Sequence, residues 1–392
     1  MGFKRLRFLC SFATAFLSLL VYGPLSIAQN SADYSNILIT AQPEELLTQS
    51  WAIPTLTNPA AVAGDTTFVR IRAGARLDYL GSRRSPKDFF AAADAPFKLM
   101  GKYIGAGLVV NSNSYDIYRN LSIGTQGSYK FMLGKGVLSV GVQLGYFRAS
   151  YKGTQLELNI NGTGGNPNGP AGGGNNPSTD GNQTRDEELI PGEGDSGAGN
   201  EGSGDSGGDD NEPDDLDMPT QDMAGGALDV AVGLRYEHPA FYVGVSALHL
   251  TNSEIKLKKE NESATDLQYL RYKVPMTLYF EAGGNIAFKN SLISLQPSLS
   301  MLSDFKDIQG VAVVRATYNQ RFSLGFNYRY NRAAGVLASI NIKNFFLGYN
   351  WEYDYKWHPK GSTGNHELVL GYKFKLESGG KNNFSHRSIR IM

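Results

Sequence analysis

Apolar and polar side chains alternate with a period of two along most of the chain. In one stretch the apolar positions Phe322, Leu324, Phe326, Tyr328 and Tyr330 alternate with polar or small residues, and residues 69–79, 228–237 and 368–376 repeat the pattern. Such a period places successive side chains on opposite faces of an extended strand. The repeats are about as long as the roughly 9–11 residues that a tilted strand needs to cross a bilayer.

Two environments produce this alternation: a soluble β-sandwich with apolar side chains inside, and a membrane barrel with apolar side chains toward lipid. Tyrosines end several apolar faces, as Tyr79, Tyr146, Tyr236 and Tyr330 do, which suits the aromatic girdle of a membrane barrel. The polar faces combine arginine, lysine and glycine, as a wet or plugged interior requires. We therefore predict an all-β fold, a transmembrane antiparallel β-barrel of the outer-membrane type.

The alternating segments number fourteen, and bacterial single-chain barrels have an even number of strands. They lie near residues 67–79, 87–95, 102–111, 119–132, 136–150, 226–237, 240–250, 274–288, 291–303, 309–318, 321–331, 334–342, 345–355 and 365–376. The barrel is thus predicted over residues 67–376.

The connections predict the orientation of the barrel. With the chain starting in the periplasm, connections after even-numbered strands are expected to be short turns, and those after odd-numbered strands longer external loops. Short turns at residues 238–239, 289–290 and 319–320 agree, as do long connections at residues 111–118, from residue 251, and at residues 356–364. The connection of residues 95–101 is longer than this rule expects, and that of residues 332–335 is shorter.

A glycine-rich acidic insert separates the fifth and sixth segments. Residues 161–222 hold 15 of the 37 acidic residues of the chain and one of its 37 basic residues, so the rest of this formally neutral chain is basic. Few apolar side chains and many glycines predict a disordered segment, and its place after an odd-numbered strand predicts an extracellular loop. A solvated spacer is one interpretation, and calcium binding by its carboxylates is the other.

The first 28 residues have the features of a secretory signal peptide. Lys4, Arg5 and Arg7 precede an apolar run over residues 8–22, and residues 26–28 form a small-x-small cleavage site. Cys10 is the single cysteine of the chain, so no disulfide is expected after cleavage. Residues 377–392 are predicted to be a C-terminal periplasmic tail, with both mature termini in the periplasm of a Gram-negative bacterium.

Two motifs flank the predicted barrel. The first precedes the first strand, and the second combines a tyrosine-rich strand end with a histidine–glutamate pair. Their residues are Trp51, Asn58, Pro59, Ala60 and Gly64 in the first motif, and Tyr353, Asp354, Tyr355, His366 and Glu367 in the second. Together with the arginines of the first strand, the motifs resemble the PorP/SprF family of type IX secretion system membrane proteins. The resemblance covers nearly all of the mature chain except the acidic insert.

This resemblance implies a non-enzymatic component of the type IX protein secretion and gliding machinery, embedded in outer-membrane lipid. Its implied partners are periplasmic ring or lipoprotein subunits of the machine and secreted cargo such as a surface adhesin. The first motif is then a candidate contact with these partners. The alternative function is a passive or substrate-selective outer-membrane channel.

Basic residues recur on the predicted polar faces. They are Arg70, Arg72, Arg76, Arg235, Arg329 and Lys373. One interpretation is a lumen lining neutralised by Asp78, Asp229, Glu237 and Glu367, and the other is a basic lumen that holds a plug or passes anions. Residues 29–66 are accordingly a candidate plug or periplasmic docking arm.

The sequence contains no recognisable catalytic or metal-binding constellation. Its five histidines form no H-E-x-x-H motif, and a G-x-S-x-G elbow is absent. His366 and Glu367 are adjacent in a predicted strand and therefore point to opposite faces. We expect no catalytic residue, cofactor or metal. Nucleic acid is not an expected partner, because the basic residues are spread over lumen positions rather than gathered in one patch.

Overall fold

The computed structural model describes residues 38–41, 45–82, 85–99, 102–154, 221–259, 269–288 and 291–375. The predicted signal peptide, nearly all of the acidic insert and the C-terminal tail lie outside these ranges. Within them, no helix has the length and apolar character that crossing a membrane would take.

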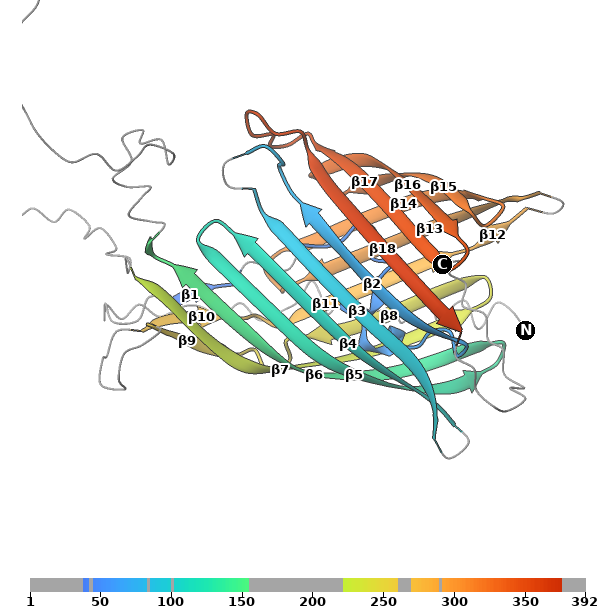
Figure 1. The fold of residues 1–392 in the computed structure, drawn as a ribbon, viewed down its shortest axis with the longest axis horizontal. Helices are drawn as coiled ribbons and strands as arrows, with labels where there is room; N and C mark the ends of the chain where they lie inside the picture. The colour runs from blue at the N-terminus through green and yellow to red at the C-terminus, as the bar shows by residue number, and fades with distance from the viewer. Residues whose placement is uncertain are drawn as a thin grey trace, which may run out of the picture.

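Fourteen antiparallel strands close into a barrel (Figure 1). In barrel order they are β2 (Phe68–Leu77), β3 (Lys87–Leu99), β4 (Lys102–Tyr115), β5 (Tyr118–Leu133), β6 (Gly136–Lys152), β7 (Asp222–His238), β8 (Phe241–Leu248), β11 (Thr277–Gly284), β13 (Ile293–Ser303), β14 (Ile308–Tyr318), β15 (Phe322–Arg329), β16 (Ala333–Ile342), β17 (Phe345–Asp354) and β18 (Asn365–Lys375). Pairing of β18 with β2 closes the sheet, so no barrel strand has an open edge. The predicted fold and strand number are confirmed.

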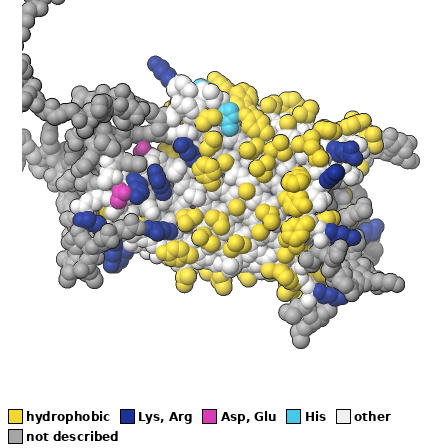
Figure 2. Space-filling view, viewed as in Figure 1, with side chains coloured by type: hydrophobic (Ala, Val, Ile, Leu, Met, Phe, Trp, Pro, Cys, Tyr) yellow, Lys and Arg dark blue, Asp and Glu magenta, His cyan; other side chains and the backbone are white. Residues whose placement is uncertain are grey.

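Side chains alternate between the two faces of the barrel wall as the sequence pattern predicts. In β15, Phe322, Leu324 and Phe326 are exposed, whereas Ser323, Gly325 and Asn327 are buried. The same alternation runs through β14 and β17. Figure 2 shows the resulting apolar band on the outer surface. Apolar side chains that face lipid remain exposed in the isolated chain, because the bilayer is their solvent.

Two connections differ in length from the sequence expectation. β3 continues to Leu99 and β4 starts at Lys102, so the connection expected over residues 95–101 is a short turn. β4 and β5 extend to Tyr115 and from Tyr118, so the expected external loop of residues 111–118 is mostly strand. The polar residues there continue the strand ladder beyond the apolar band, where alternation of hydrophobicity no longer marks a strand.

Three short strands were not expected. β9 (Glu254–Lys259) and β10 (Leu270–Lys273) form a hairpin in the long connection between β8 and β11, and β1 (Leu38–Thr40) pairs with β10 in parallel. This small sheet shares a buried core with the ends of β6 and β7. The core includes Phe147, Tyr151, Met223, Ile255, Leu257, Leu270 and Tyr272. β12 (Ile286–Ala287) pairs with β13 beside the end of β11.

The barrel has two unlike ends. We call the end with the short hairpins after β3, β5, β7, β14 and β16 the turn end, and the opposite end, where β9, β10 and the stem of the acidic insert lie, the loop end. Figure 1 shows β1, β9 and β10 together at the loop end. β1 lies there, whereas β2 starts and β18 stops at the turn end.

Residues 45–64, called here the plug, connect the two ends through the lumen. Thr48 binds Glu367 near the loop end, Asn58 contacts Leu234 further along, and Ala63 binds Asp94 toward the turn end. The described chain therefore begins at the end opposite to Lys375. The plug runs the length of the lumen before the first barrel strand starts, and the two mature termini, expected in the periplasm, lie outside the described residues.

The outward face of β15 offers a test of membrane depth. Phe326 lies in the middle of the strand and Phe322 at its turn end. We expect Phe326→Arg to destabilise the barrel by about 2–4 kcal/mol and Phe322→Arg by about 1 kcal/mol or less, because the cost of a lipid-facing arginine falls toward the interface. Urea titrations of the protein folded into vesicles measure both values. Equal losses would show that the apolar band is not the membrane contact.

The orientation of the chain can be tested by cysteine labelling. Outer-membrane barrels carry longer loops outside and short turns in the periplasm, so Leu38 is expected at the cell surface and Lys343, in the β16–β17 turn, in the periplasm. We expect Leu38→Cys to react with a membrane-impermeant maleimide on intact cells. Lys343→Cys is expected to react only after permeabilisation. The reverse pattern would mean that the barrel is inverted.

Candidate functional site: a plugged barrel lumen

The plug contains two 3-10 turns that start at prolines. They are η1 (Pro54–Leu56) and η2 (Pro59–Ala61). Asn58 is extended before Pro59, at φ −143° and ψ 108°, as a residue before proline prefers. Its side-chain oxygen accepts a hydrogen bond from the Ala60 N–H at 2.9 Å, and its amide nitrogen donates to the Leu234 carbonyl at 3.2 Å. Asn58 thus caps a turn of the plug and ties it to the wall.

Glycines occupy the inward positions of the wall where the plug approaches it most closely. A Cβ built on Gly141 of β6 would overlap with the backbone of Pro59 and Ala60, and one on Gly233 of β7 would overlap with the Asn58 side chain. Side chains at these two inward positions would therefore displace η2. The small residues of these strands are matched to the plug.

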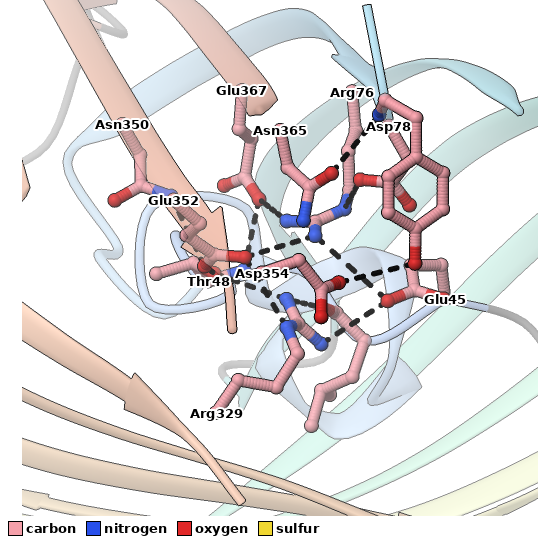
Figure 3. A network of polar contacts seen from close by, with 12 residues as sticks. Glu45, Thr48, Arg76, Asp78, Arg329, Asn350, Glu352, Asp354, Asn365 and Glu367 are labelled. Atoms are coloured by element: carbon pink, nitrogen blue, oxygen red, sulfur yellow. Dashed lines mark hydrogen bonds and ion pairs between the residues drawn. The ribbon is translucent and has the colours of Figure 1, made fainter. Parts of the chain in front are cut away.

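A buried ionic cluster joins the plug to four strands and two connections near the loop end (Figure 3). We call it the latch cluster; its members are Glu45, Arg76, Asp78, Arg329, Arg332, Glu352, Asp354 and Glu367. Arg76 of β2 lies 3.0 Å from Glu352 of β17 and 3.2 Å from Glu367 of β18. Arg329 of β15 lies 3.2 Å from Glu352. These four side chains are buried, so each charged group requires an oppositely charged partner among them.

The latch cluster also holds the plug backbone. The Glu367 carboxylate accepts the N–H groups of Thr48 and Gln49 at 2.9 and 2.7 Å. The Thr48 hydroxyl donates to Glu352, and Arg329 donates to the Leu46 carbonyl at 2.8 Å. Hydrogen bonds to charged partners are the stronger kind. The plug is therefore bound through its main chain as well as its side chains.

Two carboxyls of the latch cluster outside the strands respond differently to burial. Burial alone would raise the pKa of the Glu45 carboxyl, but the charges of Arg332, Arg329 and Arg76 outweigh it and lower this pKa. Burial raises the pKa of the Asp78 carboxyl to about 6, although Arg76 lies 2.9 Å away. Glu45 of the plug is thus held as a carboxylate by arginines of the barrel, 2.7 Å from Arg332.

Two further groups of ion pairs line the lumen. At the turn-end part of the plug, Asp94 of β3 lies 2.6 Å from Arg70 and accepts the Ala63 N–H at 2.8 Å. Further around the wall, Arg235 of β7 pairs with Glu237 at 2.8 Å and with Glu281 of β11. Arg70 and Arg235 are thus each paired with acids of the barrel wall.

The structure places the residues of the first sequence motif inside the barrel. Trp51 packs edge-on against Phe346 at 5.7 Å, and the Arg315 guanidinium lies 3.3 Å from the centre of its indole ring. Asn58, Pro59 and Ala60 are buried. These residues are enclosed by strands and belong to the plug, which was one of the two interpretations of residues 29–66.

The residues of the second motif divide between the two faces of the wall. Glu367 and Asp354 face the latch cluster, whereas Tyr353 and Tyr355 are exposed. His366 lies on the outer face, 2.7 Å from the Tyr349 hydroxyl. Of the predicted lumen residues, Arg70, Arg72, Arg76, Arg235 and Arg329 are buried inside and Lys373 is half-buried near the turn end.

Sequence reasoning missed several partners of these arginines. They are Glu45, Asp94, Glu281 and Glu352. The sequence signal that could have identified them is an acidic residue at an inward position of a strand, as Glu352 is in β17. Among the described residues, no group of three histidines or acids is placed to hold a metal ion.

A hollow of about 440 Å³ opens at the loop end beside the latch cluster. Tyr79, Tyr118, Tyr272 and Trp357 contribute aromatic side chains to its lining, and Glu45 contributes a carboxylate. Tyr79 and Trp357 pack edge to face at 4.9 Å. The hollow therefore joins aromatic surface to the charged latch cluster.

The fold and the site define an outer-membrane β-barrel whose lumen is occupied by its own N-terminal segment. The profile of the type IX secretion system membrane protein PorP/SprF family matches residues 39–186 and 197–372. The chain belongs to this family. The match extends over the plug and the barrel.

Comparisons with other proteins are more distant. No curated protein matches the chain. Among solved structures, an Acinetobacter baumannii outer membrane protein has 7% identity, with 80% of this chain and 100% of that chain covered and a TM-score of 0.37. The Ralstonia pickettii toluene transporter TbuX has 11% identity, coverages of 82% and 93%, and a TM-score of 0.41. A Pseudomonas aeruginosa FadL homologue has 11% identity, coverages of 81% and 91%, and a TM-score of 0.41.

The seat of the plug can be tested with a pair of glycines on adjacent strands. Gly141→Val is expected to unseat η2 at a cost of about 1–3 kcal/mol, as for other overpacked sites, while the closed barrel still resists SDS until it is heated. Chymotrypsin should then cleave after Trp51. Gly127→Val on β5 is the control, because nothing lies within 4 Å of a Cβ there. Cleavage in neither variant or in both would contradict this view of the plug.

Proposed function

We propose that the protein is a non-enzymatic barrel of the type IX secretion machinery that docks periplasmic subunits of the machine and helps export or surface attachment of cargo. The observation that carries this proposal is the plug. A barrel whose lumen is filled by its own chain suits a platform for other proteins better than a path for solutes. Family membership supports the same assignment.

The charges of the lumen favour docking over conduction. A channel for anions needs cations that a passing ion can reach. Here Arg76 and Arg329 are buried and paired with Glu352, and Arg235 is paired with Glu237 and Glu281. The positive charges of these arginines are therefore neutralised by acids of the protein itself rather than left for a passing anion. The channel remains the alternative function, with transport after release of the plug.

The two ends of the barrel suit two kinds of partner. The turn end faces the periplasm in the expected orientation, where machine subunits are available. The loop end carries the aromatic hollow with Tyr79 and Trp357, which offers contacts to cargo outside the cell. The acidic insert also attaches at the loop end, between β6 and β7.

Conductance separates the docking platform from the channel. In planar bilayers we expect the wild-type protein to be silent. The double variant Glu352→Gln/Glu367→Gln should show stable open steps, because losing partners of buried charges costs about 3–5 kcal/mol and frees the plug backbone. Glu254→Gln is the control, because its pair with Arg271 is exposed.

Co-purification tests the docking role directly. Wild-type protein extracted in mild detergent is expected to carry periplasmic machine subunits that mass spectrometry identifies. A large stable conductance of the wild type together with no bound machine subunit would favour the channel and overturn the proposal.

A further inference from the structure

The turn end of the barrel is ringed by basic side chains. We call Lys98, Lys135, Arg321, Lys343, Lys373 and Lys375 the basic rim. Lys135, Arg321 and Lys343 lie in hairpin turns after β5, β14 and β16, and Lys98 lies near the end of β3. All are exposed except Lys373, which is half-buried. Figure 2 shows Lys and Arg side chains at both ends of the barrel, with Asp and Glu side chains visible beside them at the loop end only.

Acidic side chains are nearly missing from this end. Among the described residues there, the acids are Asp65, Asp94 and Glu237. Glu237 is buried beside Arg235, and Asp65 is half-buried and accepts the Thr67 N–H at 2.8 Å. Asp94 and Glu237 are thus paired with lumen arginines, whereas Asp65 lies close to Lys373 of the basic rim. The sequence after Lys375 continues the trend, with Glu377 set against three basic residues.

The loop end has a different balance. Its exposed cations Lys258, Lys306 and Lys356 are accompanied by exposed acids such as Asp116 and Asp307. The acidic insert, with 15 acids and one basic residue, also joins the barrel at this end. Exposed charge at the loop end is therefore of both signs.

The direction of several rim side chains argues against lipid as their ligand. In β18, Leu370, Tyr372 and Phe374 face outward, so Lys373 and Lys375 belong to the inward face. In β3, Phe97 is exposed on the outside, and Lys98 follows the inward position of Pro96. The side chains that meet the lipid boundary at this end are aromatic, whereas these lysines surround the mouth of the lumen. A body lying across the mouth would meet them.

We propose that the basic rim is the docking surface for an acidic face of a periplasmic protein that covers the turn end of the plugged barrel. This inference rests on the proposed function and adds the surface and the charge of the partner. Complementary charge steers association and makes it dependent on ionic strength. The plug closes the mouth behind the rim, so the partner meets a surface rather than an opening.

Charge reversal tests the surface with a matched control. The rim variant carries Lys98→Glu, Lys135→Glu, Arg321→Glu and Lys343→Glu, and the loop-end variant carries Lys258→Glu, Lys306→Glu, Lys356→Glu and Lys360→Glu. Both make the same change in net charge, and heat-dependent mobility in SDS verifies that both barrels fold. The probe is the purified periplasmic machine subunit that co-purifies most strongly with the wild type.

We expect the rim variant to bind this subunit about tenfold or more weakly at low salt, as for electrostatically steered pairs. The loop-end variant should bind like the wild type. Replacing acids of the subunit with lysine should restore binding to the rim variant.

Three other results would overturn the inference. The first is equal binding by both variants, and the second is equal weakening in both; either leaves the proposed docking function intact. The third is unchanged subunit binding with lost binding to phosphatidylglycerol vesicles, which would assign the rim to lipid. Failure of the wild type to bind any machine subunit would instead refute the proposed function itself.

Discussion

Buried arginine is the constraint on which the interior of this barrel depends. Arg76, Arg235 and Arg329 point into a space where they are almost fully removed from solvent, and an unpaired charge there would cost several kcal/mol. Each is met by a carboxylate from another strand, as Arg76 is by Glu352 and Glu367. The register of β2, β15, β17 and β18 is thereby linked to the pairing of charges.

The plug is part of the same constraint. Glu367 and Arg329 still have hydrogen-bonding capacity after they pair, and the plug backbone uses it through Thr48, Gln49 and Leu46. Because a closed barrel leaves no strand edge to bind the plug, the plug is held largely by side chains of the inner face, with Asn58 also donating to the Leu234 carbonyl. The barrel therefore holds the plug by charge at the loop end and by close glycine contacts with η2 further inside.

Because the plug passes through the lumen, the two ends of the barrel are separate surfaces. The chain passes from β1 at the loop end to the start of β2 at the turn end, so the lumen is occupied over this whole path. What remains for other molecules is the surface at each end. The aromatic hollow and acidic insert belong to the loop end, whereas exposed charge at the turn end is basic.

The sequence by itself determined the fold class, the fourteen strands, the alternation of inward and outward side chains along them and the family. All of these follow from period-two alternation and from short motifs, which are local properties of the chain. It also indicated inward arginines, such as Arg235 on the polar face of its strand. It did not reveal β1, β9 and β10, because these strands are short and their core forms only when they meet β6 and β7.

Only the tertiary structure decided which charges pair and where residues 45–64 lie. Glu352 meets Arg76 across more than 270 residues of sequence, and Glu367 meets Thr48 across 319. No periodicity specifies such contacts, since they depend on barrel closure and strand stagger. The sequence therefore left the plug and the docking arm as two interpretations of residues 29–66. Closure of the barrel around Asn58 places the first motif in the lumen, because the glycines at positions 141 and 233 leave room for it there and its polar groups find partners on the wall.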